Sequence, residues 1–169
     1  MNLTDLFTAQ LDREADRCRR ALERVPEGRN GWKPHDKSME LGYLSTLVAT
    51  MPGWVAMAIT QDQLDLNPPG GQSQRPAEWE TTADLLASLD DAVAKARQAL
   101  AGTTDEHLQT PWQLLVAGEV VLEDPRYMVI AETFTHLAHH RGQLTVYLRL
   151  NDVPVPSIYG PSADDRSFA

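Results

Sequence analysis

The stretch "HLAHHRGQ", residues 136–143, contains three of the five histidines in this chain of 169 residues. On an α-helix, His136 and His140 lie one turn apart and about 40° apart in projection, whereas His139 points elsewhere. Neutral imidazoles at this spacing can bind one ion such as zinc. The spacing therefore makes His136 and His140 candidate metal ligands, and His139 is expected at the surface.

The helix around this stretch is predicted over residues 125–150, because it opens with a proline and its apolar residues recur at three-and-four spacing. His136 and His140 lie at the margin of the apolar stripe, so ordinary side-chain hydrogen bonds are an alternative to ligation. The zinc metalloprotease motif has a glutamate where this chain has Leu137, so protease chemistry has no support. Glu132, one turn before His136, either orients that imidazole as a hydrogen-bond acceptor or forms a plain helical pair with it.

Other residues of note are assigned to the core and to packing. Arg141 projects onto the apolar stripe, where an unpaired charge is costly, so it is expected to reach outward or to meet a carboxylate. Cys18 lies on the apolar side of the first predicted helix, which indicates a buried thiol rather than a nucleophile. The tryptophans flank loops or kinks and are expected to pack at helix ends; these are Trp32, Trp54, Trp79 and Trp112.

The same apolar spacing predicts three earlier helices, over residues 3–25, 38–66 and 81–101. Ser38 is expected to cap the second helix and Pro52 to kink it. A loop is predicted at residues 67–80, and a Thr-x-x-Asp pattern marks the start of the helix after it. Two short apolar runs around Gly118 indicate a small hairpin or an irregular excursion before the last helix.

Four amphipathic helices predict an all-α fold, a four-helix bundle that forms one domain over residues 1–169. Residues 151–169 form a proline-rich tail that is not expected to be helical. The sequence has no internal repeat of fixed period, so a repeat architecture is not predicted.

The net charge and composition of the chain limit the classes of partner that it is expected to bind. The chain has 15 basic and 24 acidic residues, a net charge of −9, which repels nucleic-acid phosphates, so no nucleic-acid partner is expected. No apolar run approaches the roughly 20 residues of a membrane span, so no membrane partner is expected either. The single Cys18 and the opening residues, which lack the apolar core of a secretory signal, favour a cytoplasmic location.

Three stretches resemble the DinB-like, or DinB/YfiT, superfamily, and the likeness covers almost the whole chain. The most specific stretch contains a His-x-x-x-His-Arg-Gly-Gln helix and then a proline-rich tail with Tyr-Gly. The resemblance implies a bundle of up-down-down-up type, often paired as a homodimer, with a divalent metal such as zinc or nickel held by three histidines. The stretches are "KPHDKSMELGYLSTLVATMPGW" (33–54), "TPWQLLVAGEVVLEDPR" (110–126) and "HLAHHRGQLTVYLRLNDVPVPSIYG" (136–160).

The resemblance matches two of the three metal-binding histidines to His136 and His140. The third belongs to the second helix, in a Leu-x-x-Leu-x-x-His pattern whose last position is Leu47 in this chain. Two imidazoles leave a zinc-like ion at least two donors short, so the metal is expected to be weakly held or absent. Glu40 lies roughly 10 Å from Leu47 along the helix axis and is too distant to replace it. Other donors that could contribute are Thr46, Thr50 and His35.

The resemblance leaves two functional hypotheses. Relatives with a complete site are linked to metal-dependent transfer of small thiols, which implies a transferase or hydrolase that activates a thiol or water at His136 and His140. The alternative is a noncatalytic dimeric bundle that has lost the metal and binds a small apolar ligand or acts structurally, with Leu47 in the vacated place. The sequence assigns no catalytic residue, and the pair is predicted only as metal ligands.

Overall fold

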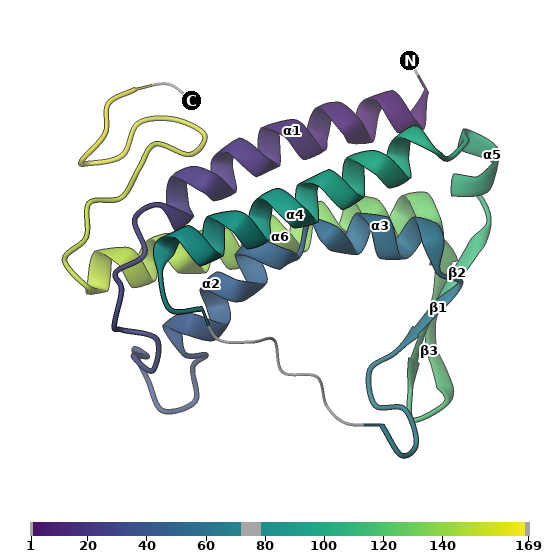
Figure 1. The fold of residues 1–169 in the computed structure, drawn as a ribbon, viewed down its shortest axis with the longest axis horizontal. Coiled ribbons are helices and arrows are strands. Elements are labelled where there is room, and N and C mark those ends of the chain that lie inside the picture. The colour runs from purple at the N-terminus through teal and green to yellow at the C-terminus, as the bar shows by residue number, and fades with distance from the viewer. Residues whose placement is uncertain (1, 72–78, 168–169) are drawn as a thin grey trace.

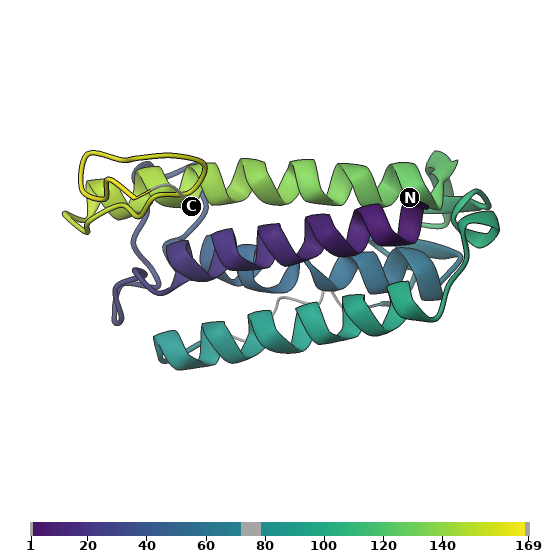
Figure 2. The ribbon, with the colours of Figure 1, turned by 90° about the horizontal axis from the view of Figure 1, so that it is seen from above.

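Three long helices and one broken helix form the body of the computed structural model, which describes residues 2–71 and 79–167 (Figure 1). The α1 and α6 helices run in one direction, and the broken helix and α4 run in the opposite one, the order that the resemblance implies. Both α4 and α6 pack against α1 and against the broken helix, which gives the four-membered arrangement seen in Figure 2. The helices are α1 (Leu3–Leu22), α2 (Leu41–Thr50) and α3 (Gly53–Thr60), which make up the broken one, α4 (Thr82–Ala101) and α6 (Arg126–Leu150).

The α4 helix begins and ends where the sequence predicts. The Thr81 hydroxyl accepts a hydrogen bond from the Asp84 amide, and the Asp84 carboxylate accepts one from the Thr81 amide at 2.8 Å, so the two residues form a capping box. The α1 helix ends at Leu22, three residues before the predicted end. Of the loop predicted at residues 67–80, residues 72–78 lie outside the described part of the chain.

The second predicted helix starts later than expected, at Leu41, and Ser38 is not its cap. The N-cap residue is Glu40. The Leu41 amide donates to the carbonyl of Trp32 at 2.8 Å, so the preceding loop satisfies an amide that a helix start leaves without an intrahelical acceptor. This loop contact, which the sequence pattern does not show, sets the start of the helix.

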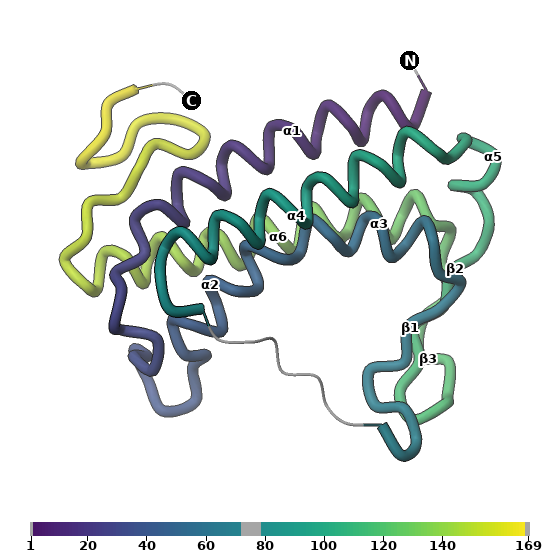
Figure 3. Tube along the Cα trace, viewed as in Figure 1, coloured from purple at the N-terminus to yellow at the C-terminus, as the bar shows by residue number. Residues whose placement is uncertain are grey.

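At Pro52 the predicted helix is broken, not merely kinked. The α2 and α3 helices are separate, and the angle between them is 54° (Figure 3). Proline has no amide hydrogen for the helical ladder, which explains the break. The α3 helix then ends at Thr60 rather than near Leu66. Among the described residues no single helix combines the length and apolar content of a membrane span, and α2 and α3 reach them only as this bent pair.

A small sheet lies where α3 ends and α6 begins, so the all-α prediction is wrong in this part of the chain (Figure 1). Strands β2 and β3 form a hairpin, which is one of the two alternatives predicted here, and β1 pairs in parallel with β2. The sequence pattern assigned the β1 residues to a helix. The strands are β1 (Gln63–Asp65), β2 (Pro111–Val116) and β3 (Glu119–Pro125), and the four-residue helix α5 (Asp105–Leu108) lies between α4 and β2.

The hairpin turn explains how β1 is attached. Its two residues, Ala117 and Gly118, both have positive φ angles, 53° and 85°, as a tight two-residue turn requires. Their amides donate to the Asp65 carboxylate at 3.1 and 2.8 Å. One side chain at the end of β1 therefore fixes that strand to the turn of the hairpin.

Residues 151–167 follow α6 without helix or strand and fold back over the ends of α1 and α6 (Figure 1). Asp164 forms an ion pair with Arg149 of α6 and accepts a hydrogen bond from the Val155 amide at 2.8 Å. Tyr159 contacts the charged cluster between the two helices that is described below. The described part of the tail is thus non-helical, as expected, and is tied to the bundle.

Candidate functional site

The two candidate ligands on α6 contact each other. The Nε2 atoms of His136 and His140 are 2.9 Å apart. His140 is buried, with 9% of its surface exposed, whereas His136 is exposed and lies edge-on to Trp54 of α3, with the ring centres 5.7 Å apart. His139 is exposed, as predicted. The helical spacing therefore brings the pair together in the way that a shared proton or a shared ion needs.

A glutamine orients the pair. The Nδ1 atom of His140 lies 2.8 Å from Oε1 of Gln143, one turn further along α6. Glu132 is a predicted candidate for orienting His136, whereas Gln143 is not identified from the sequence. Its spacing of three residues from His140 is the signal that could have identified it, because residues three apart are neighbours on a helix.

The electrostatic setting favours the neutral form of His136. Its partial burial lowers the pKa of His136 below the ordinary value, and the neighbouring His140 and His139 lower it further. A neutral imidazole carries one N–H and one lone pair, so this side chain can ligate a metal or accept a hydrogen bond at neutral pH.

The donor set does not fit a resident metal held by three histidines. Leu47 is half-buried and supplies no donor. Within residues 2–71 and 79–167, no three side chains of histidine, cysteine, aspartate or glutamate are grouped so that they could hold a metal ion. Thr46 and Thr50 donate their hydroxyls to helix carbonyls at 2.8 Å, and His35 accepts a hydrogen bond from a loop amide at 3.1 Å. Thr46, Thr50 and Nδ1 of His35 therefore take part in local hydrogen bonds.

An apolar cleft of about 640 Å³ opens beside His136, between α3, α6 and the sheet. Its walls come from segments that are far apart in the sequence, and most of its lining is aliphatic or aromatic. It is lined by Trp54, Met57, Leu64, Leu66, Trp112, Leu114, Leu122, Val129, Glu132, Thr133, Thr135, His136 and His139. A cavity of this volume and character is typical of a small-molecule site.

The tryptophans divide between packing and this cleft. Trp79 is buried and donates its indole N–H to Ser45 Oγ at 3.1 Å, and Trp32 packs edge-on against Tyr147. Trp54 and Trp112 line the cleft, a location that their positions beside loops did not indicate. The buried indole N–H of Trp112 has no hydrogen-bond partner among the described residues.

Arg141 forms an ion pair with a carboxylate, which is one of the two outcomes expected from the sequence. Its guanidinium is 1% exposed and forms an ion pair with Glu14 of α1, which is 5% exposed. It also donates to the Tyr159 hydroxyl at 2.6 Å, and Arg17 stacks on the Tyr159 ring, 4.2 Å from its centre. Cys18 lies in the same cluster, and burial raises the pKa of its thiol to about 11, so it is the inert thiol that the sequence predicted.

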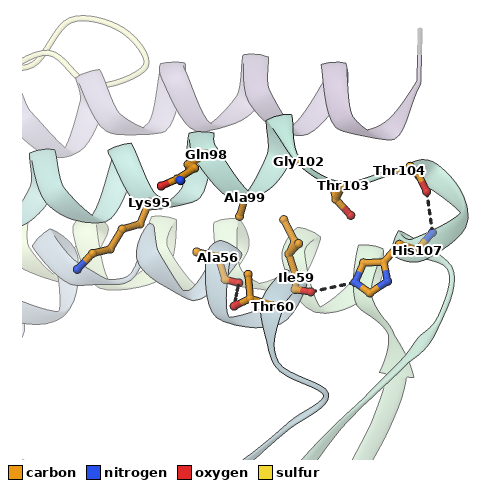
Figure 4. Close-up of a pocket in the computed structure, with 10 residues that line it drawn as sticks. All are labelled: Ala56, Ile59, Thr60, Lys95, Gln98, Ala99, Gly102, Thr103, Thr104 and His107. Atoms are coloured by element: carbon orange, nitrogen blue, oxygen red, sulfur yellow. Dashed lines mark hydrogen bonds between the residues drawn. The ribbon is translucent and has the colours of Figure 1, made fainter.

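A second hollow, of about 740 Å³, lies between α3, α4 and α5 (Figure 4). His107 donates from Nε2 to the carbonyl of Ile59 at 2.9 Å and so closes the end of α3. Lys95 at its rim is paired with Asp91. This hollow contains none of the residues that the sequence singled out, and the buried Thr103 hydroxyl in its lining has no hydrogen-bond partner among the described residues.

Solved structures with the same fold are DinB-like proteins. A DinB-like protein from Bacillus subtilis is 18% identical, with a TM-score of 0.66, over 87% of this chain and 92% of that one. A DinB-like protein from Bacillus cereus is 16% identical, with a TM-score of 0.67, over 90% and 95%. No curated protein matches the sequence. At these identities the likeness establishes the fold class, a DinB-like helical bundle.

The family follows from the sequence itself. The family model described as the DinB superfamily matches residues 10–144, which is most of the chain. The protein belongs to the DinB superfamily.

Proposed function

We propose that this protein binds a small, largely apolar molecule in the cleft between α3, α6 and the sheet. The observation that carries the proposal is the cleft itself, whose volume of about 640 Å³ suits a small organic molecule. Burial of apolar ligand surface there contributes roughly 25 cal/mol for each Å² removed from water. His136, which lines the cleft and contacts His140, supplies a polar group to the lining.

Binding of the neutral dye Nile red, followed by its fluorescence, tests this proposal. Leu122 lines the cleft, whereas its neighbour Val121 on β3 is exposed to solvent. We expect the wild type to bind the dye, Leu122→Glu to lose binding because a charge enters the apolar wall, and Val121→Glu to retain it. Equal binding by both variants, or no binding by the wild type, would contradict the proposal.

A second candidate function is metal-dependent catalysis, and the 2.9 Å approach of the two Nε2 atoms favours it. A divalent ion bound there would lower the pKa of a thiol or of water. Because the described residues supply two imidazoles and no third histidine, cysteine or carboxylate, we expect thiol-transfer activity to be weak or undetectable. Thiol conjugation that is lost with a chelator, restored by a divalent ion and abolished in His140→Ala would favour metal-dependent catalysis over the binding of an apolar ligand.

A further inference from the structure

The hydrogen bonds that link Gln143, His140 and the cleft residue His136 have a direction. The carboxamide oxygen of Gln143 faces Nδ1 of His140, so that nitrogen carries the proton. In a neutral imidazole the other nitrogen, Nε2, then has a lone pair and accepts a hydrogen bond from Nε2–H of His136, 2.9 Å away. His136 in turn keeps its lone pair on Nδ1, which no described residue occupies.

From this polarity we infer that the ligand of the cleft is a neutral aromatic or aliphatic molecule with one hydrogen-bond donor, such as a phenol, directed at Nδ1 of His136. The inference rests on the proposed function, because it assigns the ligand class of the same cleft. It does not require a metal ion, in contrast to the three-histidine site that the family resemblance implies.

The other polar groups of the cleft agree with this ligand class. The hydroxyls of Thr133 and Thr135 already donate to helix carbonyls at 2.9 and 3.2 Å, so they are not free donors for the ligand. Glu132 adds a carboxylate to the lining, and the chain has a net charge of −9, so an anionic ligand is disfavoured. The buried indole N–H of Trp112, which also belongs to the lining, has no partner among the described residues, and a neutral hydroxyl group can both donate and accept a hydrogen bond.

Calorimetry with two probes of nearly the same shape tests the inference. At about pH 7.5, where an unperturbed histidine is neutral, 1-naphthol presents an O–H group and 1-methoxynaphthalene does not. We expect the wild type to bind 1-naphthol about tenfold more tightly, the order expected for one partly buried hydrogen bond. Equal affinities, or a preference for the ether, would overturn the inference, whereas failure to bind either probe would count against the proposed function.

Two histidines provide matched variants. His136→Phe keeps a ring beside Trp54 but removes Nδ1, so the preference for 1-naphthol should disappear while both probes still bind. His35→Phe changes an exposed histidine outside the cleft lining and should leave the preference intact. If His35→Phe abolished the preference and His136→Phe did not, the assigned acceptor would be wrong.

A measurement on the wild type keeps the inference testable even if a variant does not fold. The nitrogen-15 chemical shifts of the His136 ring report which nitrogen carries the proton. We expect an unprotonated Nδ1 and a protonated Nε2 at about pH 7.5 in the free protein. A protonated Nδ1 would reverse the direction of the relay and refute the inferred ligand class.

Discussion

At the scale of single residues, the site depends on what each side chain can donate or accept. Leu47 is half-buried and stands where the family resemblance implies a histidine. His136 and His140 contact each other through Nε2, and Gln143 holds the second ring. The pair therefore forms a hydrogen-bonded unit in which Nδ1 of His136 has no partner among the described residues, and it is incomplete as a set of metal ligands.

Restoring the third imidazole should convert this pair into a metal site. We expect Leu47→His to raise the affinity for zinc or nickel by about tenfold or more, because a third neutral nitrogen from α2 joins the two on α6. Isothermal titration with untagged protein measures the gain, and His136→Ala in the same background should abolish it. An unchanged affinity would mean that Leu47 does not correspond to the family's third histidine.

The pKa of His136 should be measurably lower than that of a free histidine. Burial favours its neutral form in the folded state, and His140 and His139 add to the effect. The resulting contribution to stability is present above the unfolded-state pKa and is lost as the pH falls below about 6.5. An NMR titration of the wild type and of His139→Asn tests this, and the variant should show a higher pKa for His136. A value at or above the ordinary one in the wild type would contradict the expectation.

At the scale of secondary structure, the helices could be predicted from local pattern and the sheet could not. Apolar spacing identifies α1, α4 and α6 because each helix buries one continuous stripe. The β1 strand has only three residues, Gln63–Asp65, and it exists because it pairs with Gln113 to Leu115 of β2, far along the chain. Helical spacing likewise brought His136 and His140 together, whereas the cleft walls from α3 and the hairpin meet only in the folded molecule.

Asp65 is expected to hold one wall of the cleft in place. Asp65→Ala removes the acceptor for the Ala117 and Gly118 amides, so β1 should loosen from the hairpin together with Leu64 and Leu66, which line the cleft. We expect weaker Nile red binding and faster hydrogen exchange in β2. Asp65→Asn keeps one acceptor oxygen and should show a smaller effect. Unchanged binding in Asp65→Ala would show that this contact does not support the wall.

At the scale of the whole molecule, the buried ion pair of Glu14 and Arg141 joins the first helix to the last. Glu14→Ala leaves the guanidinium buried without its carboxylate, and we expect the free energy of unfolding to fall by about 3 kcal/mol in urea denaturation. Asp16→Ala on the same helix removes a partly exposed pair with Arg20 and should cost less than about 1 kcal/mol. Similar losses in the two variants would contradict the importance of the buried pair.

Replacing both residues of the pair by apolar residues distinguishes two contributions to the free energy of unfolding. These are the cost of leaving one charge unpaired in the core and the stabilisation that the ion pair itself provides. We expect Glu14→Leu combined with Arg141→Met to recover most of the stability lost in Glu14→Ala, because neither charge is then left alone in the core. The Tyr159 hydroxyl would lose its guanidinium partner in this double variant, so the recovery should be incomplete.

We also expect the bundle to form a homodimer, on the strength of the family resemblance described above. Light scattering at micromolar concentration measures the mass directly. A monomer mass under these conditions would refute the expectation, without bearing on the cleft, because every residue assigned to the cleft belongs to one chain.

Because the ribosome makes the chain from its N-terminus, Glu14 is synthesised well before its ion-pair partner Arg141. The two residues are 127 positions apart, so at about 5–20 residues per second the arginine follows the glutamate by roughly 6 to 25 seconds. Throughout that interval the nascent first helix carries a carboxylate whose partner in the core has not been synthesised. The nascent chain is therefore expected to remain open to chaperones until the last helix has left the ribosome.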